Sequence, residues 1–102
     1  MTVIGRTVLE AAARRHPDAA QPLADWLTVA TAAHWQSLAD VRRQYPSADG
    51  VRLPSGNVIT VFNIGGKKYR LLTAIVYRRE TLTVLEALTH AEYNKNKWKR
   101  KY

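Results

Sequence analysis

The fold is decided by the stretch Val58-Ile59-Thr60-Val61-Phe62-Asn63-Ile64-Gly65-Gly66. Residues 58–64 are mostly β-branched or aromatic, a composition that favours a β-strand. The two glycines that follow accept the positive φ angles that a tight hairpin turn demands. We therefore expect a strand over 58–64 and a two-residue hairpin turn at Gly65-Gly66.

Two more strands are predicted downstream of this turn. Residues 68–77 form the second arm of the hairpin, residues 78–80 turn the chain again, and residues 81–89 supply a third strand. Because the connections are short, the three strands should pair as an antiparallel meander. Arg78 and Arg79 fall at the tip of the second turn, where solvation explains them without a function.

The half of the chain before the meander is predicted to be helical. Capping-box patterns occur at Thr7 and Ser37, each three residues before an acidic residue. They predict a first helix that Pro17 ends and a third helix that ends before Pro46. Apolar residues at three- and four-residue intervals predict the second helix over 18–33. We also expect an edge strand over 2–4 and a turn over 47–50, of which Asp49-Gly50 is the clearest part.

A third capping box, from Thr89 to Glu92, stands at the end of the last strand and predicts a short helix from His90 to about Lys97. The expected fold is therefore α+β. A short N-terminal strand and helices pack on an antiparallel β meander that ends in a short C-terminal helix, giving two layers. At 102 residues the chain fits one domain, over residues 1–102.

The charge of the chain points to a polyanionic partner. Sixteen Lys and Arg residues against eight Asp and Glu give a formal net charge of +8. The surplus is uneven, because the segment 95–101 is basic with no acidic residue, whereas residues 7–49 are nearly balanced. A field concentrated near one end suggests a face that binds phosphates. A solvated basic tail is the alternative explanation.

Several classes of site lack the residues they need. There is no cysteine, and neither His16 nor His34 has the partner spacing of a metal site, so we expect no metal and no cofactor. No apolar run reaches the roughly eighteen residues that cross a membrane. The N-terminus does not resemble a signal peptide. The expected location is cytoplasmic.

The predicted C-terminal helix carries a stripe of residues suited to proton transfer. At helical spacing, His90, Tyr93 and Lys97 lie on one narrow face. An imidazole, a phenol and an ammonium group pack poorly together but can accept and donate protons. Cleavage of RNA without a metal needs a base, an acid and a group that neutralises charge on the phosphate.

The residues predicted to neutralise the charge of the phosphate lie at the start of the strand that follows the hairpin turn. Lys68 and Arg70 are two residues apart, so their side chains should share one face of the sheet and clamp a phosphate together. Asn63, across the hairpin, could hold a base or a phosphate oxygen. Each residue also has an ordinary explanation: a solvated arginine, a tyrosine covering the sheet edge, a surface lysine. These residues alone indicate an RNA-binding face and leave cleavage open.

The order of these motifs resembles a known family. The segments Phe62-Asn63-Ile64-Gly65-Gly66, Tyr69-Arg70-Leu71 and Thr89-His90-Ala91-Glu92-Tyr93 are similar to those of HigB, the toxin of HigB–HigA toxin–antitoxin modules, in the RelE-like ribonuclease group. The resemblance covers most of the chain and is strongest from Phe62 to Tyr93. One departure is Lys67, which stands where members often have asparagine.

The resemblance implies a RelE-like fold and an mRNA interferase. Such an enzyme cleaves messenger RNA on the translating ribosome without a metal, and a HigA-type helix-turn-helix antitoxin protein holds it inactive. The implied catalytic residues are Arg70, His90 and Tyr93. The implied RNA-binding residues are Asn63, Lys68 and Lys97, to which the basic C-terminal segment adds Lys95, Lys99 and Arg100. The alternatives are a non-catalytic RNA- or ribosome-binding protein and a module that only docks another chain.

Overall fold

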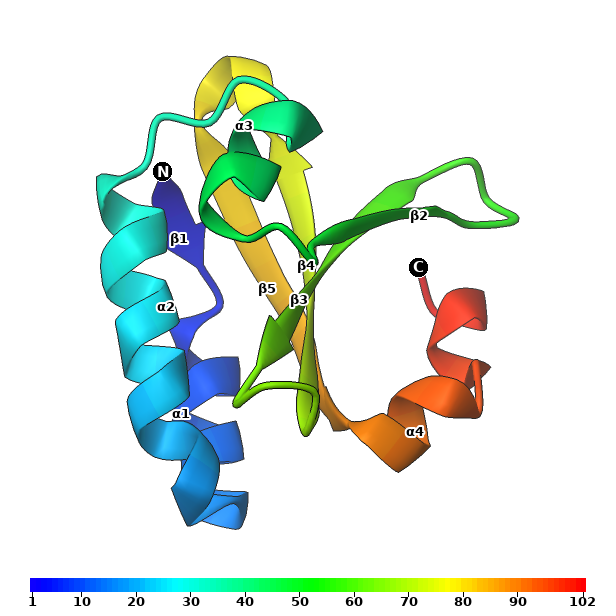
Figure 1. Cartoon of the computed structure of the whole chain (residues 1–102). Helices are drawn as coiled ribbons and strands as arrows, with labels where there is room; N and C mark the ends of the chain where they lie inside the picture. Colours follow the sequence, from blue (N-terminus) through cyan, green and yellow to red (C-terminus); the bar gives the residue numbers. More distant parts are fainter.

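A computed structural model describes all 102 residues and shows a five-stranded mixed sheet (Figure 1). The strands lie in the order β1-β5-β4-β3-β2. They are β1 (Thr2–Ile4), β2 (Asp49–Arg52), β3 (Val58–Ile64), β4 (Tyr69–Val76) and β5 (Thr81–Thr89). Strand β1 runs parallel to β5, and all other neighbours are antiparallel. The predicted meander is confirmed as β3, β4 and β5, at the centre of the sheet.

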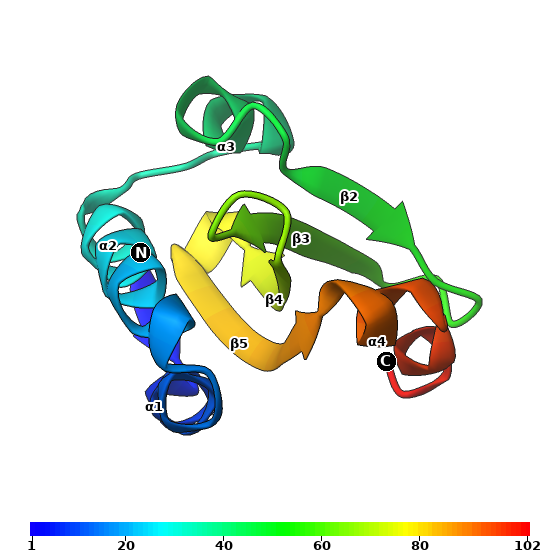
Figure 2. The ribbon, with the colours of Figure 1, turned by 60° about the horizontal axis from the view of Figure 1, so that its bottom comes forward.

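The helices divide between the two faces of this sheet. The helical elements are α1 (Arg6–Arg15), the 3-10 helix η1 (Pro17–Ala19), α2 (Ala20–Ala32), α3 (Leu38–Gln44), the 3-10 helix η2 (Tyr77–Arg79), α4 (His90–Asn94) and the 3-10 helix η3 (Lys97–Arg100). Figure 2 shows α1 and α2 on one side of the strands and α4 with the C-terminus on the other. The α+β class is confirmed. None of the helices is long and apolar enough to cross a membrane.

Strand alternation sends one set of side chains into a core beneath α1, α2 and α3. Phe62 is fully buried there, and its ring centroid lies 5.4 Å from that of Trp26, 5.9 Å from Trp35 and 5.3 Å from Tyr45. Leu71, opposite Phe62 in the register of β3 and β4, is fully buried in the same core. These contacts join three segments of the helical half to the meander and so fix the helical layer on this face.

The other face of the sheet has a smaller core that holds the C-terminal segment. Trp98 is 2% exposed and packs in a cluster with Val61 and Leu72, whose side chains point away from α1 and α2. Its indole Nε1–H donates to the carbonyl oxygen of Tyr93 at 3.1 Å. The basic segment 95–101 is therefore folded against the sheet and is not a solvated tail.

Helix α1 begins at Arg6, so the capping box predicted at Thr7 is wrong. Gly5 is the N-cap instead, with φ of 89°. A β-carbon at Gly5 would lie 2.7 Å from the carbonyl oxygen of Val84, so the chain leaves β1 in close contact with β5. Only glycine combines that approach with a left-handed backbone. The other two boxes are confirmed as N-caps at Ser37 and Thr89.

Two turn predictions are also wrong. Asp49 and Gly50 lie in strand β2, where they pair with Val61 and Thr60 of β3. The chain turns later, at residues 53–57, where the backbone N–H of Leu53 donates to the carbonyl oxygen of Asn57 at 2.8 Å. The hairpin between β3 and β4 is wider than two residues, because Ile64 pairs with Tyr69 and leaves residues 65–68 as the loop. Both glycines of that loop have positive φ, as expected.

Helix α4 is shorter than predicted and ends at Asn94, not near Lys97. Asn96 has φ of 60°, a left-handed conformation that asparagine tolerates better than most residues, and it redirects the chain into η3. That change of direction places Trp98 in its cluster on the sheet. Helix α4 therefore ends at Asn94, where the chain turns so that the Trp98 indole can be buried.

Candidate functional site

Four of the predicted site residues come together on the face of the sheet that carries α4. Asn63 and Arg70 are direct cross-strand partners in β3 and β4, so their side chains share this face. His90 and Tyr93 reach it from α4, which follows directly after β5. The site lies at the end of the sheet where β4 begins and β5 ends.

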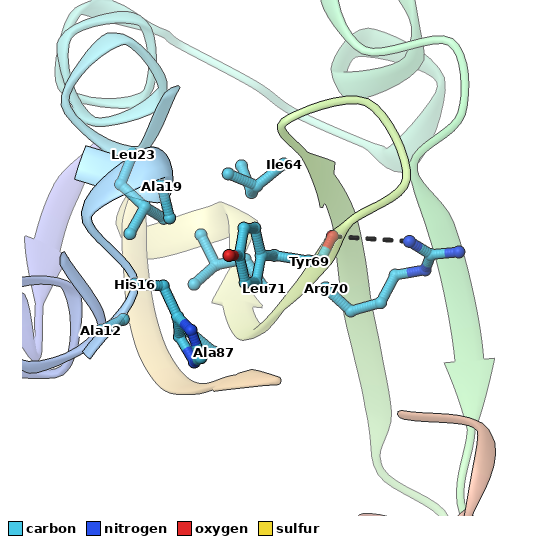
Figure 3. Close-up of a pocket in the computed structure, with 9 residues that line it drawn as sticks. All are labelled: Ala12, His16, Ala19, Leu23, Ile64, Tyr69, Arg70, Leu71 and Ala87. Carbon is cyan, nitrogen blue, oxygen red and sulfur yellow. Dashed lines mark hydrogen bonds between the residues drawn. The ribbon is translucent and has the colours of Figure 1, made fainter. Parts of the chain in front are cut away.

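Arg70 is half-buried and held by three hydrogen bonds. Its Nη1 donates to the carbonyl oxygen of Lys67 at 2.7 Å and more weakly to that of Tyr69 at 3.5 Å. Its Nη2 lies 3.1 Å from Nδ1 of His90. Figure 3 shows Arg70 extending away from its neighbours Tyr69 and Leu71, which point toward the helices. The loop and α4 together fix the guanidinium group.

His90 is exposed and is placed by the first turn of α4. The backbone N–H of His90 donates to the carbonyl oxygen of Lys68 at 3.0 Å, which attaches the start of the helix to the loop. Because a guanidinium group can only donate, Nδ1 of His90 must accept the bond from Arg70. The imidazole is therefore neutral in this arrangement and carries its proton on Nε2.

The capping box of α4 fixes the orientation of the helix. The side chain of Thr89 accepts from the backbone of Glu92 at 3.2 Å, and Glu92 Oε1 accepts from the backbone of Thr89 at 2.9 Å. The bond from the Thr89 backbone, as the largest cause, lowers the pKa of Glu92, and the nearby charges of Arg15 and His16 add to the effect. A carboxylate at this position satisfies N–H groups that would otherwise lack partners.

The ring of Tyr93 lies between Arg70 and Trp98. It stacks on Trp98 with centroids 5.2 Å apart and planes 17° apart, and the Arg70 guanidinium carbon lies 5.5 Å from its centroid. Burial raises the pKa of the Tyr93 phenol and the charge of Asp49 raises it further, whereas Arg70 opposes the shift. The hydroxyl therefore keeps its proton at neutral pH. Its ring also supports the guanidinium group through a cation–π contact.

The predicted pairing of Lys68 with Arg70 on one face is wrong. Lys68 lies in the loop before β4, and its Nζ is 3.6 Å from a carboxylate oxygen of Asp18 in η1. The predicted stripe of His90, Tyr93 and Lys97 is also incomplete, because Lys97 lies beyond the end of α4. Lys97 lines a hollow of about 260 Å³ together with Lys95, Trp98 and the two carboxylates Glu86 and Glu92.

The other basic residues of the C-terminal segment surround Trp98. Lys95 and Arg100 are exposed, and the Nζ of Lys99 lies 5.8 Å from the centroid of the Trp98 ring. Lys101 Nζ is 3.1 Å from Glu86 Oε1, which ties the end of the segment to β5. The segment that follows α4 therefore presents Lys95, Lys97 and Arg100 to solvent. No group of three or more His, Cys, Asp or Glu side chains is placed to hold a metal ion.

Sequence reasoning missed Asp49 and Asp18. Asp49 shares the face of Asn63, because its partner Val61 lies two residues before Asn63 on β3, and its charge acts on Tyr93. The Pro54-Ser55-Gly56-Asn57 turn signature, just before β3, was the signal that could have revealed β2. Asp18 contacts the loop from the helical layer, and no local pattern marks it.

The comparisons with known proteins give one family. Residues 19–96 match the family model of the HigB toxin, described as a RelE-like toxic component of a toxin–antitoxin system. The matched span includes β2 to α4 and the four residues that the Arg70 guanidinium contacts, Lys67, Tyr69, His90 and Tyr93. No curated protein matches the chain.

Proposed function

The chain belongs to the HigB toxin family of toxin–antitoxin systems, and we propose that it is an endoribonuclease that cleaves messenger RNA without a metal ion. The observation that carries this proposal is the 3.1 Å contact between Arg70 and His90, which sets a permanent cation beside a neutral imidazole on an open face. A phosphate held by one is within reach of the other.

In the proposed reaction, the 2′-oxygen of the RNA attacks the adjacent phosphorus as its proton passes to a base. The bond from phosphorus to the 5′-oxygen breaks, and that oxygen takes a proton from an acid. The products are a 2′,3′-cyclic phosphate and a free 5′-hydroxyl. Charge grows on the phosphoryl oxygens in the transition state, so a fixed cation beside them lowers the barrier.

Arg70 is the proposed cation. Its guanidinium group has five N–H donors, of which three bond to Lys67, Tyr69 and His90. Two N–H donors remain free, one on Nε and one on Nη2. Together they can make a two-point contact with a phosphate. The bonds to the loop hold the group in place, so little conformational entropy is lost when the phosphate binds.

We assign the base to His90 and the acid to Tyr93. The Tyr93 phenol, with its raised pKa, keeps its proton and is therefore a poor base and an available donor. The neutral His90 imidazole has a lone pair on Nδ1, which becomes free when Arg70 Nη2 exchanges its bond to His90 for one to the phosphate, while the Nη1 bonds to the loop remain. Asn63, opposite Arg70, is placed to contact a base or a phosphate oxygen.

The wider surface supports an RNA substrate and a protein inhibitor. Lys95, Lys97, Lys99 and Arg100 supply a positive field beside Arg70, and single-stranded RNA follows such fields. By family, we propose that cleavage occurs on the translating ribosome in the cytoplasm. We also propose that a HigA-type antitoxin protein neutralises the toxin by binding it.

The test is cleavage of ribosome-bound message in the presence of a chelator. The wild type should give fragments that end in 2′,3′-cyclic phosphate or 3′-phosphate. The variants His90→Ala and Arg70→Lys should each lose roughly a hundred-fold in rate, the usual contribution of one catalytic group. His34→Ala is the matched control, because His34 is exposed and pairs with Glu80 at the far end of β5.

The alternative is an RNA-binding protein that does not cut. It predicts intact message at all times and RNA binding that His90→Ala leaves unchanged. Intact message with wild-type protein, once any antitoxin has been removed, contradicts the ribonuclease proposal. Growth arrest on induction that His90→Ala relieves supports it, because a binder has no use for the imidazole.

A further inference from the structure

The residue next to Arg70 reaches the opposite face of the sheet. Tyr69 points toward the helices, and its hydroxyl donates to Oδ1 of Asp18 at 2.6 Å (Figure 3 shows the ring among residues of the helical layer). Its ring lies 5.0 Å from the imidazole of His16, centroid to centroid. Arg70 and Tyr69 are thus consecutive residues, one in the site and one bound to the helical layer.

The segment 67–69, which comprises the end of the loop and the first residue of β4, is held from both faces of the sheet. Its backbone carbonyls face the site, where Lys67 accepts from Arg70 at 2.7 Å and Lys68 accepts from the backbone of His90 at 3.0 Å. Its side chains face the helices, where Tyr69 and Lys68 both contact the carboxylate of Asp18. The Asp18 carboxylate therefore anchors the segment 67–69, and the backbone of that segment in turn positions Arg70 and His90.

The loop needs such an anchor because it starts with Gly65 and Gly66. Both adopt positive φ, and nothing lies near the open side of Gly66. Glycine has the greatest backbone freedom, so these residues cannot hold the carbonyls of Lys67 and Lys68 in one orientation. The bond to Asp18 raises the pKa of Tyr69, and the same bond is the largest cause that lowers the pKa of Asp18.

We propose that Asp18 is a positioning residue for Arg70 and His90. It acts through its contacts with Tyr69 and Lys68, which hold the segment 67–69 in place. This inference rests on the proposed ribonuclease function. Asp18 touches no reacting atom, and it lies on the face of the sheet opposite the site. Its side chain is about half exposed, so its loss should affect the geometry of the site more than the stability of the fold.

The kinetic test uses Asp18→Ala, Asp18→Asn and Tyr69→Phe. Asp18→Ala and Tyr69→Phe should lower kcat by about ten-fold with KM unchanged. The phosphate still binds, but the Arg70 and His90 side chains are less well positioned for the reaction. The double variant should be no slower than Asp18→Ala, since that substitution already removes the acceptor of the Tyr69 hydroxyl. Asp18→Asn should recover most of the rate, because its amide oxygen can still accept from the Tyr69 hydroxyl. Asp25→Ala, an exposed aspartate on α2 that bonds only to Gln21, is the control.

A second readout does not depend on activity. Carbon-13 NMR of labelled tyrosine should show the Tyr69 pKa falling in Asp18→Ala, and nitrogen-15 NMR should show the Nδ1 signal of His90 losing its hydrogen bond to Arg70. If the tyrosine signal moves while kcat and the His90 signal stay as in the wild type, the proposal is overturned. If the wild type does not cut RNA, the ribonuclease proposal fails by itself, and the His90 signal still decides whether Asp18 positions the pair.

Discussion

At the scale of single residues, the site is built by groups that serve two purposes. Tyr93 supports the Arg70 guanidinium with its ring and carries a hydroxyl whose pKa burial raises. Arg70 binds the loop and the imidazole while keeping two donors free. Substitutions that remove a whole side chain therefore mix two effects. Substitutions that remove only the reactive atom separate them.

Tyr93 allows that separation. Tyr93→Phe keeps the ring between Arg70 and Trp98 and removes the proposed acid, so kcat should fall by roughly a hundred-fold while folding is unchanged. Tyr93→Leu should lose further activity, because the guanidinium also loses its support. The measurement is single-turnover cleavage of ribosome-bound message by each purified variant.

A modified substrate identifies the role of the hydroxyl. Sulfur in place of the leaving 5′-oxygen departs without a proton, because a thiol is far more acidic than an alcohol. This substrate should restore cleavage by Tyr93→Phe but not by His90→Ala, whose defect lies in the attack step. Equal restoration of both variants, or of neither, would show that the two roles are assigned wrongly.

At the scale of elements, α4 is the least supported part of the site. It has only five residues, so its own hydrogen bonds cannot stabilise it, and it depends on the capping box and on the Trp98 anchor that follows. The pKa of Glu92 is lowered in the folded protein, chiefly by its bond from the Thr89 backbone. A lowered pKa means that this stabilisation is present above the ordinary carboxyl pKa and is lost as the pH falls through the folded value.

We therefore expect α4 to loosen on acidification before the sheet does. The protection of the His90 and Tyr93 amides, measured against their intrinsic exchange rates, should fall as the pH is lowered below the ordinary carboxyl pKa, before that of amides in β3 and β4 falls. Glu92→Gln should remove much of that pH dependence, since a neutral amide can still accept from Thr89. Glu10→Gln, an exposed residue of α1, is the control. An unchanged pH profile in Glu92→Gln would mean that another group governs the helix.

The elements also show what local sequence can and cannot predict. The meander and the Thr89 cap were predictable, because strand composition and a capping box act within a few residues. Strand β2 could be inferred only from the turn signature that follows it, because Asp49-Gly50 has the composition of a turn and becomes a strand by pairing with β3. The direction of Lys68 was missed for a related reason, since the register of the hairpin places it in the loop.

Long-range contacts explain what else was missed in the site. Arg70, His90 and Tyr93 were predicted as site residues because motifs mark them, and the structure places them as neighbours. Asp18 and Tyr69 are 51 residues apart in sequence, and nothing local to either indicates their bond. The position of Trp98 likewise depends on a cluster whose other buried members come from β3, β4 and the loop residue Leu53. Such contacts form only when the chain is folded, so local sequence patterns do not indicate them.

At the scale of the whole molecule, the proposed RNA substrate would be held according to where charge lies relative to the site. Lys95, Lys97 and Arg100 belong to the segment that Trp98 anchors on the face of the sheet carrying Arg70. Arg78 and Arg79 lie in η2, at the opposite end of β4 and β5. Net charge alone does not distinguish the basic residues of the C-terminal segment from those of η2. Only the first group lies in the segment that packs on the face of the sheet carrying Arg70.

This difference predicts how RNA binding depends on salt. Binding of single-stranded RNA releases counterions, and the logarithm of the binding constant falls with the logarithm of salt by about 0.7 for each phosphate contacted. Lys95→Gln, Lys97→Gln and Arg100→Gln should each reduce that slope by up to about this amount, whereas Arg79→Gln, at the far end of the sheet, should leave it unchanged. The measurement is a titration with RNA that has 2′-deoxyribose at the cleavage position, which binds but cannot react. An equal effect from Arg79→Gln would show that charge acts over the whole surface, and the RNA path beside α4 would then have to be abandoned.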